Sequence, residues 1–116
     1  MSSQVSINFS DENVALLSSL TDGLGDFLIH SNFGVYVDHL SQIRLYAEKK
    51  DEDAFKNNVT SATLFGGSGA LWEIWIENLE KRKEFEKRFC GFVDHLLKMG
   101  IKNPRIQQIR KGFMLQ

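Results

Sequence analysis

Three glycines lie within four positions of the stretch LFGGSGALWEIW, residues 64–75. Glycine-rich loops that open a helix often bind phosphate, because backbone N–H groups and the positive end of the helix dipole face the anion. A Walker-type loop also needs a lysine directly after the last glycine, and this chain has an alanine there. Glu73 would add a negative charge in the first helical turn. We therefore interpret Gly66, Gly67 and Gly69 as a glycine corner between two helices, and we expect no cofactor.

The sequence VDHL occurs twice, at residues 37–40 and 93–96. Histidine and carboxylate ligands suit zinc or iron, so His39 and His95 are the candidates for a metal site. Adjacent residues on a helix point about 100° apart, however, so neighbouring Asp and His side chains do not readily share one ion. We interpret both motifs as polar edges of amphipathic helices and expect no metal. An enzyme or metal protein that uses these histidines is an alternative hypothesis.

Cys90 is the only cysteine, so the chain has no intramolecular disulfide and no cysteine cluster for zinc. Its position on the flank of an aromatic helical stripe favours a buried, inert thiol over a nucleophile. No serine stands in a G-x-S-x-G context, which nucleophilic hydrolases of one large class require. The sequence therefore indicates a protein that is not an enzyme.

The length of 116 residues and the composition, 42% hydrophobic and 25% charged, predict one globular domain that spans residues 1–116. Residues 1–64 carry nine acidic and four basic side chains, whereas residues 65–116 carry six acidic and ten basic ones. The charge balance is therefore −5 in the first part and +4 in the second, which can steer a charged partner. We interpret the basic residues near the C-terminus as a solvated face and expect no nucleic acid partner.

Apolar residues recur at helical spacing along most of the chain, and no alternating strand pattern persists. Ser10, Asp51 and Asn103 are the predicted N-caps, and Gly100 is a predicted C-cap. We expect helices from Ser10 to HSNFG, at about 32–49, at about 54–64, at about 69–99, and from Pro104 onward. This pattern predicts an all-α fold, a small bundle of four to five helices with one long helix near residues 69–99.

The predicted long helix has an apolar stripe that keeps its phase from Leu71 to Leu96 at about 100° per residue. Trp75 falls on that stripe, whereas Trp72 and Ile76 fall to one side. These two residues are either buried against another helix or exposed to a partner. At the glycine corner, we expect the first two glycines to end one helix in left-handed conformations and the serine between the glycines to cap the next.

The stretch MSSQVSINFSDENVALL lacks a basic start and an apolar core, so we expect no secretory signal. No apolar run approaches the roughly 20 residues that span a bilayer. We therefore expect a cytoplasmic protein with no membrane association.

Residues 65–73, FGGSGALWE, resemble the F-G-G-M-G-S-[L/F]-N-D-like motif of a family of small uncharacterised bacterial helical proteins. The matching positions are Phe65, Gly66, Gly67, Gly69 and Leu71. The positions that differ are Ser68, Ala70, Trp72 and Glu73. The resemblance covers these nine residues firmly and residues 12–80 loosely. It implies a protein similar to the immunity proteins that bacteria encode beside toxins, and it brings no catalytic residues.

We therefore expect a cytoplasmic immunity protein that neutralises a cognate protein toxin by direct binding and occlusion of its active site. Acidic clusters and aromatic side chains would contact the toxin. The candidate residues are Asp51, Glu52, Asp53, Trp72, Glu73, Ile76 and Glu77. The alternative is a regulatory or scaffold module that forms a homodimer, or binds a partner helix, through the stripe of the long helix.

Overall fold

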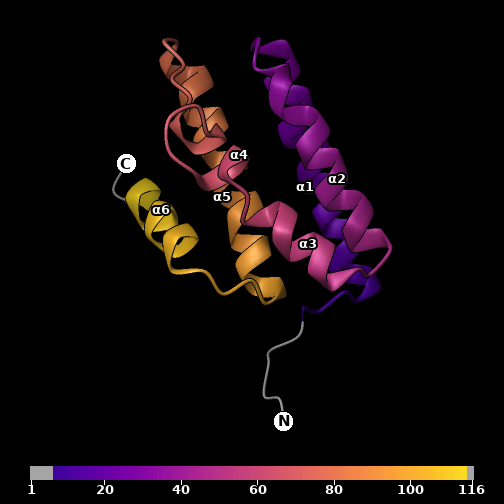
Figure 1. The fold of residues 1–116 in the computed structure, drawn as a ribbon. Coiled ribbons are helices and arrows are strands. Elements are labelled where there is room, and N and C mark those ends of the chain that lie inside the picture. Colours follow the sequence, from indigo (N-terminus) through magenta and orange to yellow (C-terminus); the bar gives the residue numbers. More distant parts are fainter. Residues whose placement is uncertain (1–6, 115–116) are drawn as a thin grey trace.

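All regular elements in the part of the chain that the structure describes, residues 7–114 of a computed structural model, are helical (Figure 1). The elements are α1 (Asp11–His30), the 3-10 helix η1 (Gly34–Tyr36), α2 (Val37–Glu48), α3 (Glu52–Val59), α4 (Ala62–Phe65), the 3-10 helix η2 (Leu71–Glu73), α5 (Leu79–Met99) and α6 (Pro104–Met114). Five of the α-helices have eight residues or more. The predicted all-α bundle of four to five helices is confirmed.

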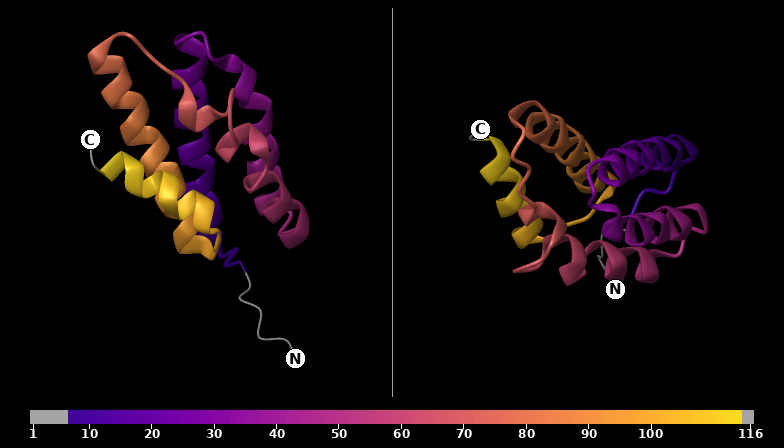
Figure 2. Two further views of the ribbon diagram at one scale, coloured as in Figure 1. Left: turned by 60° about the vertical axis from the view of Figure 1, so that its left-hand side comes forward. Right: turned by 90° about the horizontal axis from the view of Figure 1, so that it is seen from above.

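Helix α1 is the central element, since it packs against both α2 and α5. Helix α3 crosses the lower end of α2, and α6 lies on the outer side of α5, away from α2 (Figure 2). The short segments α4 and η2 pack on each other, and α4 also contacts α6. The glycine corner, which connects α4 to η2, therefore lies close to α6.

Side-chain caps begin α1, α3 and α6 at the residues that the sequence predicts. The Ser10 hydroxyl accepts a hydrogen bond from the N–H of Asn13 at 3.2 Å, and the Asp51 carboxylate accepts one from the N–H of Ala54 at 3.2 Å. Asn103 caps α6 in the same way, at 3.1 Å. Gly100 ends α5 with a φ of 121°, which favours glycine. The predicted caps at Ser10, Asp51, Asn103 and Gly100 are confirmed.

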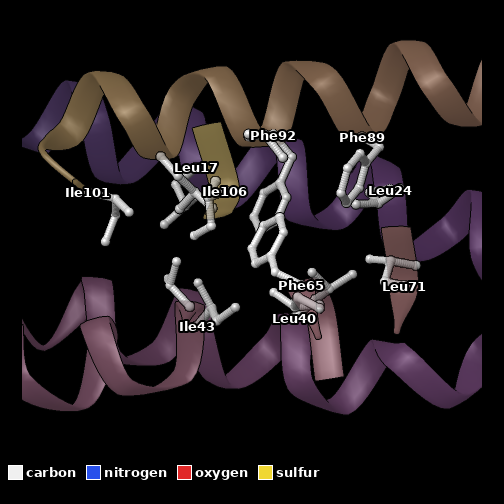
Figure 3. Packing of buried hydrophobic residues seen from close by; sticks show 14 of the residues in the cluster. Leu17, Leu24, Leu40, Ile43, Phe65, Leu71, Phe89, Phe92, Ile101 and Ile106 are labelled. Atoms are coloured by element: carbon white, nitrogen blue, oxygen red, sulfur yellow. The ribbon is translucent and has the colours of Figure 1, made fainter. Parts of the chain in front are cut away.

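Large apolar side chains from α1, α2 and α5 meet in one core (Figure 3). The stripe of α5 supplies its aromatic centre, with Phe89 and Phe92 fully buried and Phe85 only 2% exposed. The rings of Phe85 and Phe89 stack at 5.5 Å. This stripe is buried inside the single chain, so it is not exposed to form the intermolecular seam of the alternative homodimer hypothesis.

The long helix begins ten residues later than the sequence pattern predicts, at Leu79 instead of Gly69. Asn78 starts it, since its side chain accepts a hydrogen bond from the N–H of Lys81 at 2.9 Å. The Arg82 guanidinium binds two backbone carbonyls ahead of that cap. The helical spacing of apolar residues does not reveal this start, because the spacing continues across residues 74–78. The break is made by the polar side chains of Asn78 and Arg82, which bind the backbone there.

Two other predicted helices also contain breaks. Helix α2 starts at Val37, after the 3-10 turn η1, and not near Asn32. The predicted helix at 54–64 divides into α3 and α4, because the chain turns at Thr60. The Thr60 hydroxyl donates to the carbonyl of Lys56 at 2.8 Å, a local bond that competes with helix continuation.

In residues 7–114, no helix combines the length and apolar character that crossing a membrane requires. The stretch that carries the prediction of no secretory signal begins with residues 1–6, which lie outside the described residues. It stays a prediction.

Candidate partner-binding site

The glycine corner is held by side chains that donate to its backbone carbonyls. The carbonyl of Gly66 accepts from Trp72 Nε1 at 2.6 Å and from Arg105 Nη2 at 2.9 Å. Arg105 Nε donates to the carbonyl of Phe65 at 2.7 Å, and the Tyr36 hydroxyl donates to that of Gly69 at 2.7 Å. The corner thus joins η1, α4, η2 and α6 and has a structural role.

The conformations of the glycines differ from those predicted. Gly66 has a φ of −81°, so it does not end α4 in the left-handed region, whereas Gly69 has a φ of 87°. Gly66 is needed for close approach, since a Cβ there would lie 2.6 Å from the carbonyl oxygen of Ala62. The predicted cap at Ser68 is also wrong, because the residue before η2 is Ala70 and no side chain caps that turn.

The burial of Trp72 and Ile76, which the sequence left open, is decided by the fold. Ile76 is 7% exposed and belongs to the core. Trp72 packs against the core and uses its indole N–H inside the corner. Ile76 is therefore buried, whereas Trp72 is half-buried with its indole N–H turned into the corner.

Trp75 is the exposed aromatic residue instead, with 66% of its surface accessible. The prediction that it lies on the buried stripe is wrong, because the backbone at Ile74 is extended and breaks the helical phase. The cap residue Asn78, with an acid two positions later, is the sequence signal that would have placed the helix start correctly. With that start, Trp75 falls in a loop.

A guanidinium group holds the Trp75 ring in place. The Cζ atom of Arg82 lies 3.9 Å from the ring centroid, within the range of cation–π contacts. The same guanidinium donates to the carbonyls of Ile76 at 2.8 Å and Glu77 at 3.2 Å. Its orientation is therefore fixed by the loop that carries the tryptophan.

Leu79, the first residue of α5, is also exposed, with 55% of its surface accessible. Glu77 and Glu80 are exposed beside it. We call this set, Trp75, Glu77, Leu79, Glu80 and Arg82, the Trp75 tip. Glu73 is exposed on η2, between the tip and the glycine corner.

The acidic cluster of Asp51, Glu52 and Asp53 lies at the start of α3, at the opposite end of the bundle from the start of α5 (Figure 1). Two of its carboxylates have local roles: Asp51 caps α3, and Glu52 binds Lys56 at 2.9 Å and the N–H of Ile7 at 3.3 Å. The hydrogen bonds from Lys56 and Ile7 lower the pKa of Glu52. The predicted acidic residues therefore form two separate surfaces.

The two VDHL histidines connect helices to neighbouring segments. His95 is 4% exposed, and its Nε2 lies 2.8 Å from the carbonyl oxygen of Asn13. His39 Nε2 lies 2.7 Å from the carbonyl oxygen of Asn58 and 2.9 Å from the Ser61 hydroxyl. A carbonyl only accepts hydrogen bonds, so Nε2 carries the proton and does not act as a base toward Ser61.

Within residues 7–114, no group of three or more His, Cys, Asp or Glu side chains is arranged to hold a metal ion. Cys90 is partly buried on α5, and burial raises the pKa of its thiol despite the nearby charge of Arg110. The thiol form is therefore favoured over the nucleophilic thiolate.

Comparisons with protein-family models, curated proteins and solved structures found no match to this chain. The resemblance of residues 65–73 to the F-G-G motif family stays a prediction.

Proposed function

We propose that this protein is an immunity protein, which acts in the cytosol and neutralises a cognate protein toxin by one-to-one binding and occlusion of its active site. The observation that carries the proposal is Trp75, a large aromatic side chain that is exposed and at the same time held in one orientation.

A fixed, exposed tryptophan is costly unless a partner covers it. Its ring keeps a large apolar surface in water, and burial of that surface under a partner would contribute a favourable free energy of roughly 25 cal/mol per Å². When a partner binds, however, little side-chain entropy is lost, because Arg82 already restricts the ring. Tryptophan is also among the residues that contribute most to binding at protein interfaces. The arrangement of the Trp75 tip therefore suits a protein-binding surface.

The carboxylates beside Trp75 favour a basic patch on the partner. Glu73 on η2, Glu77 in the following loop and Glu80 at the start of α5 are all exposed. Carboxylates beside an apolar centre form the polar rim that many interfaces have, and they speed the approach of a cationic surface. Proteins that bind nucleic acids or nucleotides contact the phosphates with cationic surfaces, so we propose a toxin of that class.

Co-expression with the product of the neighbouring gene tests this function. We expect the two proteins to co-purify at a fixed ratio, and we expect cells that express the neighbour to grow only when this protein is present. Absence of both a complex and growth rescue would overturn the proposal. A Leu45→Ala variant, which shortens another exposed apolar side chain on α2, should rescue as well as the native chain.

A further inference from the structure

A groove of about 510 Å³ lies between α5 and α6. Its walls include Lys83 and Lys87 from α5 and Arg110 from α6, and its apolar lining comes from Leu79, Cys90 and Phe113. The α5 residues at its two ends are eleven positions apart, which corresponds to about 16 Å along the helix axis. The groove is therefore about as long as three turns of a helix.

The groove has an excess of positive charge. Lys83, Lys87, Arg82 and Arg110 line it, and Glu86 is the acid among its lining residues. Asp94 pairs with Arg110 at 2.7 Å, so four basic groups face two acidic ones. In residues 7–114, neither lysine forms a salt bridge. These lysines are spaced four residues apart, so both lie on one face of α5.

The Arg110 side of the groove is rigid. Its guanidinium binds Asp94 through two hydrogen bonds, at 2.7 and 3.1 Å. Hydrogen bonding to Asp94 is also the main reason that the pKa of Arg110 is raised. The pair ties α6 to α5 and sets the width of the groove. A partner would therefore meet a preformed surface, which lowers the entropic cost of binding.

The groove is continuous with the Trp75 tip, because Leu79 and Arg82 belong to both surfaces. Its apolar lining between cationic walls matches a helix that has an apolar stripe flanked by carboxylates. We propose that the α5–α6 groove binds an acidic amphipathic helix of a partner protein. The inference does not require that the partner be a toxin.

The test uses the full-length protein and a fluorescein-labelled designed peptide of about four turns, with leucines on one face and glutamates on both sides of them. Fluorescence anisotropy should report saturable binding. The double variant Lys83→Glu/Lys87→Glu should weaken it at least about tenfold, because both wall charges become repulsive. A peptide with lysines in place of the glutamates should then bind this variant better than the native chain.

The matched control is Lys49→Glu/Lys102→Glu, which makes the same charge change at two exposed lysines outside the groove. It should leave peptide affinity within about twofold of native, since distant surface charges are screened. Equal losses in both double variants would overturn the inference. So would absence of saturable binding, or displacement of the peptide by single-stranded oligonucleotides or anionic vesicles at lower concentration than by unlabelled peptide. Because no neighbouring gene product is used, a failure here is separate from a failure of the toxin-binding proposal.

Discussion

The carbonyl of Gly66 accepts two side-chain hydrogen bonds, while a Cβ on the same residue would collide with Ala62 in α4. These two demands explain why the corner contains a glycine at position 66. A side chain there would push the backbone away from Ala62, and the carbonyl would lose its alignment with Trp72 and Arg105. The residue matters through geometry and not through phosphate binding.

We predict that Gly66→Ala destabilises the protein by about 1–3 kcal/mol, because the added methyl group meets backbone atoms of Ala62 that cannot move cheaply. Gly67→Ala is the matched control, since a Cβ there has no atom within 4 Å. It should change stability by less than about 1 kcal/mol. Urea denaturation followed by circular dichroism measures both, and equal losses would contradict the close-approach argument.

The carboxylate of Glu52 gives a pH prediction. Its pKa is lowered in the folded protein, so it stabilises the fold above the ordinary carboxyl pKa of about 4.3 and loses this contribution as the pH falls through the folded value. Glu52→Gln should therefore be less stable than native at pH 7, and the difference should shrink below about pH 4.

The control for this pH effect is Asp53→Asn, which removes an equal charge from the same helical turn but leaves the contacts of Glu52 with Lys56 and Ile7 in place. Thermal unfolding at several pH values compares the two variants with native protein. A stability difference for Glu52→Gln that grows on acidification would contradict the assignment.

At the scale of elements, the start of α5 decides what the surface presents. Had the helix begun at Gly69, Trp75 would lie on its buried stripe together with Leu71. Because the helix begins at Leu79, the preceding loop turns Ile76 inward and leaves Trp75 outside. The position of the Asn78 cap thus decides whether Trp75 is buried in the core or exposed.

We predict that Asn78→Ala destabilises the protein by about 1 kcal/mol through loss of the hydrogen bond to the Lys81 N–H. Asn57→Ala, at an exposed position inside α3, is the control and should be neutral or stabilising because alanine is the better helix former. Chemical denaturation of both variants tests this. An unchanged stability for Asn78→Ala would argue that α5 does not need its cap.

The starts of α1, α3 and α6 could be predicted from their side-chain caps, Ser10, Asp51 and Asn103, whereas the start of α5 was missed although Asn78 caps it. The aromatic core stripe of α5 could be predicted as well, because periodicity records burial. The break before Asn78 could not be found from periodicity, since apolar residues continue on both sides of it. The Trp75 tip was missed for that same reason.

At the scale of the molecule, the two sequence segments with opposite charge lie largely on opposite sides. Helices α2 and α3 lie on one side, and α5 and α6 on the other (Figure 1). The balance of −5 for residues 1–64 and +4 for residues 65–116 therefore gives the protein a polar field, which is screened beyond about 10 Å at ordinary ionic strength. The acidic start of α3 and the Trp75 tip are too far apart to contact one small site.

The most direct test of the central claim is isothermal titration calorimetry of the neighbouring gene product with the native protein, Trp75→Ala and Leu45→Ala. We predict one-to-one binding that Trp75→Ala weakens about 30-fold or more, as expected for removal of a central interface tryptophan. Leu45→Ala should bind within about twofold of native. Tight binding that Trp75→Ala leaves unchanged, with the variant folded by circular dichroism, would contradict the claim that the Trp75 tip binds the partner.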